Sequence, residues 1–302
     1  MIGAFLSSSE PTEEQLREFV SKKLDFINNL QIYLCKNGDI LLRPSDFPKS
    51  IISVIYALSL ADYVLFNVGK EINSFDAELS LCIENSRVDQ GGLVINDYSD
   101  TVSFEKFFSK YKVGGFTRVG SIAEVISKNT DKKFDFKYVS IDKHFIVKGI
   151  GSVIIGFVIG NQIAKGERLL LLPSLKQCSV KNIQIMDVDS AFADTGSHVG
   201  LALNNISEQD LSVNYAVSSL DMVDDKMDGQ LTMSPFYKED PFLKQLSCSF
   251  LGEVLSVSLL KENDLTKIKF NKKIPKVTGK YLLVDPSLAM GRNRVVGNFE
   301  II

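Results

Sequence analysis

The feature that most constrains the fold of this chain is a change of pattern near Phe134. Before that residue, short apolar segments such as "YVLFNV" alternate with amphipathic segments of helical spacing. After it, short runs rich in Val, Ile and Leu follow one another, separated by Gly, Asn and Asp turns. Alternating strands and helices predict a mostly parallel sheet with flanking helices, and closely spaced short strands predict small barrels.

A chain of 302 residues is long enough for two or three domains. We therefore expect an α/β domain over residues 1–133, an all-β barrel over 134–218 and a second all-β barrel over 219–302. The acidic stretch "LDMVDDKMDG" at 220–229 is the expected linker between the barrels.

Within the first region, the turn signal Asn37-Gly38 predicts a hairpin. A helix is expected to begin at Pro11, with acids in its first turn and lysines in its last, and to end near residue 24. The remaining expected elements are a strand at 2–6, helices at 48–61, 74–86 and 103–111, and strands at 63–68 and 91–97.

Composition excludes several classes of protein. The net charge of −3 gives no basic field that would attract nucleic acid to the whole molecule. The four cysteines form no C-x-x-C pair, so we expect buried or free thiols in a reducing cytoplasm and no metal or other cofactor. The apolar stretch from Ile51 to Val68 contains Asp62, which favours a helix followed by a strand over a membrane span. The N-terminus has no basic region typical of a signal peptide.

Glycines at 151 and 156 have the spacing of a phosphate-binding loop, but Phe157 and Val158 stand where Lys and Ser or Thr would be needed. Inside strands, glycine marks a bulge or a close approach of two backbones. These glycines are therefore expected to curl the barrel, together with Gly149, Gly160 and Gly166.

The segment "IDKHFIVKGIGSVIIGFVIGNQIAKGERLLLLP", with the later "GSHVGLAL", resembles the second domain of translational GTPases of the elongation factor Tu type. Its opening I-D-x-x-F and its middle part are most similar to the selenocysteine-specific factor SelB of archaeal type. The C-terminal "GRNRVVG" resembles the closing strand of the third domain. The resemblance implies a GTPase (G) domain followed by two barrels, and partners in translation: tRNA, the ribosome or a protein of that machinery.

The residues that the family uses for GTP are absent where the resemblance places them. "SSSEPTEEQL", after the first strand, has neither the Gly nor the Lys of a phosphate-binding loop. Arg43-Pro-Ser-Asp46 stands in place of D-x-x-G. Of the guanine-reading motif, Asn96 remains, but Asp97 replaces Lys and Ser99 replaces Asp. We therefore predict a degenerate G domain with no GTPase activity and no catalytic residues.

Three functions stay open at this point. The first is a SelB-like binding or regulatory module on tRNA, the ribosome or a translation partner, without GTP binding or hydrolysis. The second is an active GTP-dependent elongation factor with unusual nucleotide loops. The third is a protein-interaction scaffold unrelated to RNA.

Two groups of residues are candidate binding sites. By resemblance, Asp142, Lys143 and His198 are expected to cluster on the barrel face that meets the first domain, where Lys143 and His198 would form a cationic ligand pocket. Alternatively, Asp142 simply pairs with Lys143 or another neighbour to hold the mouth of the barrel. A lysine-rich strip is either a contact surface for RNA phosphates or a solvated edge hairpin; its members are Lys267, Lys269, Lys272, Lys273, Lys276 and Lys280.

Overall fold

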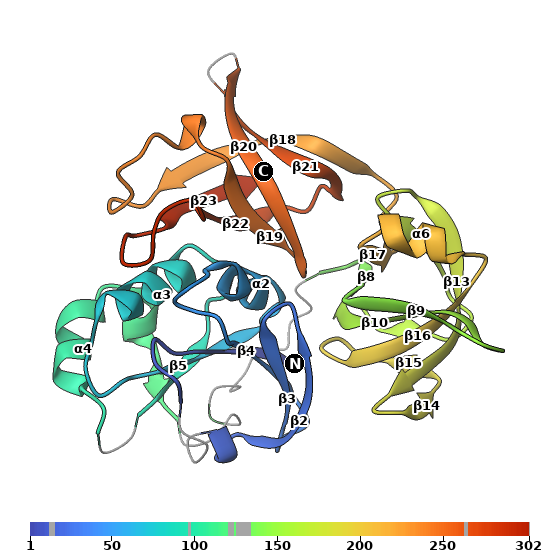
Figure 1. Ribbon diagram of the computed structural model, residues 1–302, viewed down its shortest axis with the longest axis horizontal. Coiled ribbons are helices and arrows are strands. Elements are labelled where there is room, and N and C mark those ends of the chain that lie inside the picture. The colour runs from blue at the N-terminus through green and yellow to red at the C-terminus, as the bar shows by residue number, and fades with distance from the viewer. Residues whose placement is uncertain (12–15, 96–97, 120–123, 125–133, 263–264, 302) are drawn as a thin grey trace.

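The computed structural model describes the chain except residues 12–15, 96–97, 120–123, 125–133, 263–264 and 302. Its strands form a seven-stranded sheet from the first part of the chain, a closed six-stranded ring from the middle and a second closed barrel from the last part. Figure 1 shows the two barrels beside and above the helical first domain. In the described residues no helix is long and apolar enough to cross a membrane.

The first sheet has the order β2-β3-β4-β1-β5-β6-β7 and is mostly parallel. β1 pairs in parallel with β4 and β5, and β6 in parallel with β5 and β7, whereas β2, β3 and β4 are joined by antiparallel pairs. The strands are β1 Ile2–Leu6, β2 Val20–Ile27, β3 Leu30–Cys35, β4 Ile40–Pro44, β5 Tyr63–Asn67, β6 Gly91–Val94 and β7 Thr117–Arg118. The helices are α2 Ile52–Leu60, α3 Ser74–Glu84, α4 Thr101–Phe108 and the 3-10 turn η1 Lys112–Gly115.

The expected helix from Pro11 to residue 24 is wrong over its second half, where strand β2 begins at Val20. Its residues 12–15 lie outside the described part of the chain. Phe19 is buried and β2 pairs with β3 from Val20 to Ile27, with two irregularities in register. The apolar spacing of this segment fits a helix as well as a bulged strand, and pairing with β3 decides in favour of the strand.

The middle sheet closes because β12 pairs with both β13 and β17, which completes the ring β12-β17-β8-β10-β16-β13. Strand β9 pairs with β10 and strand β14 with β13, and both extend from this ring. β11 and β15 form a separate pair. The elements are β8 Lys137–Ser140, β9 Lys143–Val147, β10 Gly151–Gly160, β11 Ile163–Ala164, β12 Arg168–Leu172, β13 Lys176–Ile185, β14 Val188–Ser190, β15 Phe192–Ala193, β16 His198–Asn204, α6 Glu208–Val213 and β17 Ala216–Ser218.

The glycine at 156 has the structural role expected of it. A Cβ at this position would lie 1.7 Å from the carbonyl oxygen of Ser140, so only glycine allows the two strands to approach so closely. Gly151 and Gly160 have φ angles of +106° and +82°, which favour glycine at both ends of β10.

The last six strands form the closed barrel β18-β21-β20-β19-β22-β23. Its elements are β18 Val223–Met233, η2 Pro241–Leu243, β19 Leu246–Phe250, β20 Glu253–Glu262, β21 Leu265–Pro275, β22 Gly279–Val284 and β23 Val295–Ile301. The acidic stretch predicted as a linker largely forms β18, because residues 223–229 pair with β21, with one irregularity in register, and the strand continues along β23 from Gly229.

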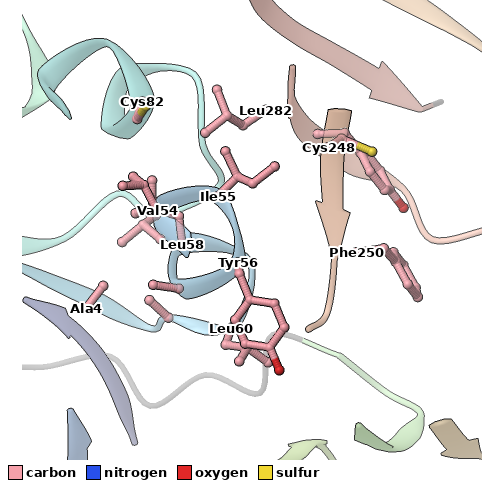
Figure 2. Packing of buried hydrophobic residues seen from close by; sticks show 14 of the residues in the cluster. Ala4, Val54, Ile55, Tyr56, Leu58, Leu60, Cys82, Cys248, Phe250 and Leu282 are labelled. Atoms are coloured by element: carbon pink, nitrogen blue, oxygen red, sulfur yellow. The ribbon is translucent and has the colours of Figure 1, made fainter. Parts of the chain in front are cut away.

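Helix α2 packs its apolar residues between the first sheet and this barrel. Figure 2 shows Ile55 of this helix pointing towards Leu282, with Cys248 and Phe250 on the strand beside it. These side chains belong to one continuous cluster of buried residues that runs through both domains. Burial of such an apolar surface stabilises the contact between the first domain and the last barrel.

A buried ion pair also joins these two domains. Arg294 and Glu78, which lies on α3, are both nearly inaccessible to solvent. Arg294 Nε and Nη2 donate to Glu78 Oε1 and Oε2 at 3.0 and 2.5 Å. Next to them, Asn298 Nδ2 donates to Asn85 Oδ1 at 2.9 Å. Polar groups paired so completely fix the relative position of the two domains.

Candidate functional site

The carboxyl ends of β1 and β4 meet at one edge of the first sheet, the position at which parallel α/β sheets bind ligands. Here the loop after β1 forms contacts with the rest of the domain. Arg43, buried at the end of β4, pairs through its guanidinium with the carboxylate of Glu10. Asn67 Nδ2 donates to Ser7 Oγ at 3.0 Å. The loop therefore presents a carboxylate and hydroxyl groups at this edge.

The resemblance places Asp46 where the family has the glycine of D-x-x-G. The Asp46 carboxylate accepts hydrogen bonds from two neighbours. Asn29 Nδ2 donates to Asp46 Oδ2 at 2.9 Å, and Ser53 Oγ donates to Asp46 Oδ1. Asp46 thus connects the β2–β3 turn to helix α2. A carboxylate that accepts a hydrogen bond on each oxygen in this way stabilises the local fold.

The guanine-motif remnant, Asn96, lies outside the described residues, as does Asp97. Ser99 donates a hydrogen bond from Oγ to the carbonyl oxygen of Val68 at 2.7 Å. Asp100 caps helix α4 by accepting a hydrogen bond from the amide of Ser103 at 3.0 Å. Both side chains therefore take part in the turn that leads into α4.

The second candidate site lies where the first domain meets the middle barrel. Asp142 follows β8 and its side chain is only 1% exposed. Tyr56 of α2 donates a hydrogen bond from its hydroxyl group to Asp142 Oδ1 at 2.8 Å, and Ser140 Oγ donates to the same oxygen at 3.1 Å. The other carboxylate oxygen, Oδ2, is buried without a partner.

His198, the first residue of β16, lies beside this carboxylate. Its Nε2 is 4.0 Å from Asp142 Oδ2, too far for a direct hydrogen bond, and is itself buried without a partner. The imidazole packs against the ring of Phe157, with 4.7 Å between ring centroids. Asp142 Oδ2 and His198 Nε2 therefore both lack a partner, and one additional hydrogen-bonding group would reach both atoms.

Lys143 points across the domain boundary. Its Nζ lies 2.8 and 2.9 Å from the two carboxylate oxygens of Asp25, on β2 of the first domain. Both side chains are partly exposed. No local pattern predicts Asp25 or Tyr56 as a partner of the barrel, because both contacts join residues that are far apart in the chain.

The electrostatics differ from the expected cationic pocket. Burial lowers the pKa of His198 to about 4, so the imidazole is neutral near pH 7. Burial raises the pKa of Asp142 to about 7, an effect that the hydrogen bonds from Tyr56 and Ser140 oppose. The charge of Lys143 is compensated by Asp25. The expectation that Lys143 and His198 form a cationic spot is therefore wrong.

A cleft of about 580 Å³ opens between β2 and the middle barrel. Of the three predicted pocket residues, only His198 lines the cleft. Lys143 pairs with Asp25 at the domain boundary, and Asp142 lies outside the lining, beside His198 and hydrogen-bonded to Tyr56. The cleft walls combine polar groups with an apolar surface that includes Phe145, Ile150, Ile155 and Val199. Such a combination suits a ligand with an apolar body and a few polar atoms.

The lysine-rich strip lies on β21, on the segment that follows it and, at Lys280, on β22. The alternative of an edge hairpin is wrong, because β21 pairs with β18 and β20 inside a closed barrel. Lys267 pairs with Asp228 and Glu262, and Lys272 pairs with Glu253. The other four side chains are exposed and form no ion pair with the described residues: Lys269, Lys273, Lys276 and Lys280.

All four cysteines are buried and free, as expected. In the described part of the chain, no three His, Cys, Asp or Glu side chains are grouped so that they could hold a metal ion.

Comparison with solved structures identifies the fold. SelB from Methanococcus maripaludis matches 99% of this chain, and the match spans 78% of that protein. The TM-score is 0.75 for its apo form and 0.77 for its complex with the GTP analogue GppNHp, at 13% and 14% identity. The chain thus has the three-domain fold of the translation elongation factors.

Within that class, the fold is that of the SelB type, as the sequence motifs indicated. A selenocysteine-specific elongation factor of Methanocaldococcus jannaschii is 32% identical over 81 residues, which are 27% of this chain and only 17% of that factor. An uncharacterized protein of the same organism is 25% identical over 221 residues, 70% of this chain and 71% of that protein. No family model matches the chain.

Proposed function

We propose that this protein is a SelB-like translation-factor homologue that acts as a binding or regulatory module without binding or hydrolysing GTP. The observation that carries this proposal is the ion pair between Glu10 and Arg43 at the carboxyl edge of the first sheet. In the GTPases that it resembles, this edge receives phosphate.

A carboxylate at this position opposes nucleotide binding for a physical reason. Phosphate sites use backbone amides and a lysine to compensate negative charge, and phosphoryl transfer adds a bound Mg²⁺. Glu10 contributes a negative charge, and Arg43, the cation beside it, is already paired. Asp46 is engaged by Asn29 and Ser53. Nucleotide would have to displace these contacts before it could bind.

The cleft lined by His198 supplies the binding function in this proposal. Its partly apolar walls and the neutral imidazole suit the aminoacyl end of a charged tRNA, whose ester carries an amino group and a variable side chain. The amino group can donate hydrogen bonds, and Asp25, on the β2 side of the cleft, is a nearby acceptor. The partner would be a tRNA alone, or a tRNA on the ribosome or with another protein of translation.

A protection assay tests this function. The intact protein is mixed with aminoacyl-tRNA in the absence of nucleotide, and the rate of ester hydrolysis is compared with that of free aminoacyl-tRNA. We expect protection that does not change when GTP is added. His198→Ala should lose it, whereas His144→Ala, the exposed histidine of β9, should retain it. Absence of protection, or protection that requires GTP, would contradict the proposal.

A further inference from the structure

Arg87 is a partly buried cation that forms no ion pair with the described residues. It lies between α3 and β6, where Nη2 donates to the carbonyl oxygen of Ser59 and the guanidinium carbon lies 5.0 Å from the centre of the Phe134 ring. Its Nε atom is buried without a hydrogen-bond partner. Burial lowers the pKa of Arg87 to about 10. A partly buried guanidinium whose Nε lacks a partner is favoured by an anion that accepts its hydrogen bonds.

A cavity of about 280 Å³ lies next to this side chain, at the junction of the first domain and the last barrel. One part of its wall is apolar and is formed by Ile55 and Leu58 of α2 with Phe250 and Leu282 of the last barrel. Thr278 and Lys280 line another part. The cavity is large enough for several atoms heavier than hydrogen and is lined by cations and hydroxyl groups.

The charged groups around the cavity leave its cations available. Lys280, on β22, is exposed and forms no ion pair with the described residues, although Glu300 lies opposite it in register on β23. Asp89 also lines the cavity, but its carboxylate pairs with Lys112 at 2.8 Å and is 82% exposed. Asp62 acts on Arg87 through its charge from outside the lining. Among the described residues that line the cavity, the cations are thus more available to a ligand than the one carboxylate.

We propose that this cavity binds a phosphate group, with Arg87 as the principal ligand and Lys280 as a second cation. The guanidinium group offers several N–H donors in one plane, a geometry that matches the oxygens of phosphate. Arg87 precedes β6, so the site lies towards the amino ends of the parallel strands, opposite the edge that carries Glu10 and Arg43. It is thus separate from the nucleotide position of this fold.

A bound phosphate would touch the first domain through Arg87 and the last barrel through Lys280 and Thr278. It would therefore strengthen the contact between them, in addition to the buried pair of Arg294 and Glu78. The phosphate could belong to a small molecule or to the 5′ end of an RNA, and the two sources can be distinguished by experiment.

Calorimetric titration of the intact protein with inorganic phosphate and pyrophosphate, at an ionic strength held constant with chloride, tests the site. We expect saturable binding by the wild type and affinity at least about tenfold weaker for Arg87→Met, because the substitution removes hydrogen bonds from a charged group. Arg292→Met serves as the control, since Arg292 is exposed and paired with Glu239 outside the cavity. Its affinity should equal that of the wild type.

Absence of binding to the wild type, or equal affinity in Arg87→Met, would overturn the proposal. If Arg87→Met does not fold, the exposed Lys280→Met carries the test, with a severalfold loss expected and unchanged affinity contradicting the site. A short RNA with and without a 5′ phosphate identifies the source. A preference for the phosphorylated RNA that Arg87→Met or Lys280→Met abolishes assigns an RNA end, and equal binding of both RNAs assigns a small phosphate compound.

Discussion

Tyr56 and Asp142 are joined by a hydrogen bond of 2.8 Å that crosses from helix α2 of the first domain to the middle barrel. The donor is the phenol and the acceptor is a carboxylate oxygen that is almost inaccessible to solvent. Helix α2 thus contacts the middle barrel through Tyr56 and the last barrel through Ile55 (Figure 2). The position of one helix couples all three domains.

Tyr56→Phe should destabilise the protein by about 1–3 kcal/mol, because it leaves a buried carboxylate oxygen with only Ser140 as a donor. Urea unfolding followed by circular dichroism measures the change. Tyr138→Phe is the matched control, since the hydroxyl group of Tyr138 is buried without a partner and its removal should cost little. Equal destabilisation of the two variants would show that the bond to Asp142 adds nothing.

The pKa values of Asp142 and His198 predict two opposite dependences of stability on pH. The pKa of Asp142 is raised from 3.8 to about 7, so the unfolded chain loses its proton first and stability falls as the pH rises through this window. The pKa of His198 is lowered from 6.5 to about 4, so stability rises with pH between these values. The two contributions largely cancel in the wild type.

Single substitutions should reveal each slope. Between pH 4.5 and 6.5, Asp142→Asn should become more stable with rising pH, and His198→Gln less stable, each with a slope of up to about 1.4 kcal/mol per pH unit relative to the wild type. Urea unfolding at several pH values measures this. His144→Gln should follow the wild type. Parallel curves for all four proteins would mean that neither pKa is shifted.

Glu78→Gln should cost about 3–5 kcal/mol, because it leaves the buried guanidinium of Arg294 without a counter-charge. Glu239→Gln is the control: it removes the partner of the exposed Arg292 and should cost less than about 1 kcal/mol. Chemical unfolding of both variants gives the comparison. A destabilisation of Glu78→Gln as small as that of Glu239→Gln would contradict a stabilising role for the buried pair.

If RNA binds, the exposed lysines of the strip should contribute a salt-dependent part of the affinity. Lys273→Ala with Lys276→Ala should flatten the slope of log affinity against log salt by about 0.7–0.9 for each phosphate group that the variant no longer binds. Lys267→Ala should leave the slope nearly unchanged, because Lys267 is engaged by Asp228 and Glu262. Binding measured over a range of chloride concentrations tests this, and equal slopes in all three proteins would exclude the strip.

Local patterns in the sequence predict much of the fold. The helix around Ile52–Leu60, the hairpin at Asn37-Gly38 and the tight approach at Gly156 each follow from spacing or turn chemistry within a short segment. Strand β2 does not, because the spacing of Phe19, Val20 and Leu24 suits a helix and only pairing with β3 selects a strand.

The site is less predictable than the fold for the same reason. Resemblance to a family placed Asp142 near His198, but no local pattern shows that Tyr56 covers the carboxylate or that Asp25 pairs with Lys143. Whether a histidine carries charge depends on such burial, and burial arises from contacts between distant segments. The neutral state of His198 therefore requires the structure.

The most direct test of the central claim is a titration of the intact protein with a fluorescent guanine nucleotide in the presence of Mg²⁺. Because Glu10 and Arg43 occupy the edge where phosphate would bind, we expect no saturable binding of GTP or GDP up to about millimolar concentration. Binding with micromolar or tighter affinity, displaced by unlabelled GTP, would contradict the account and favour an active GTPase.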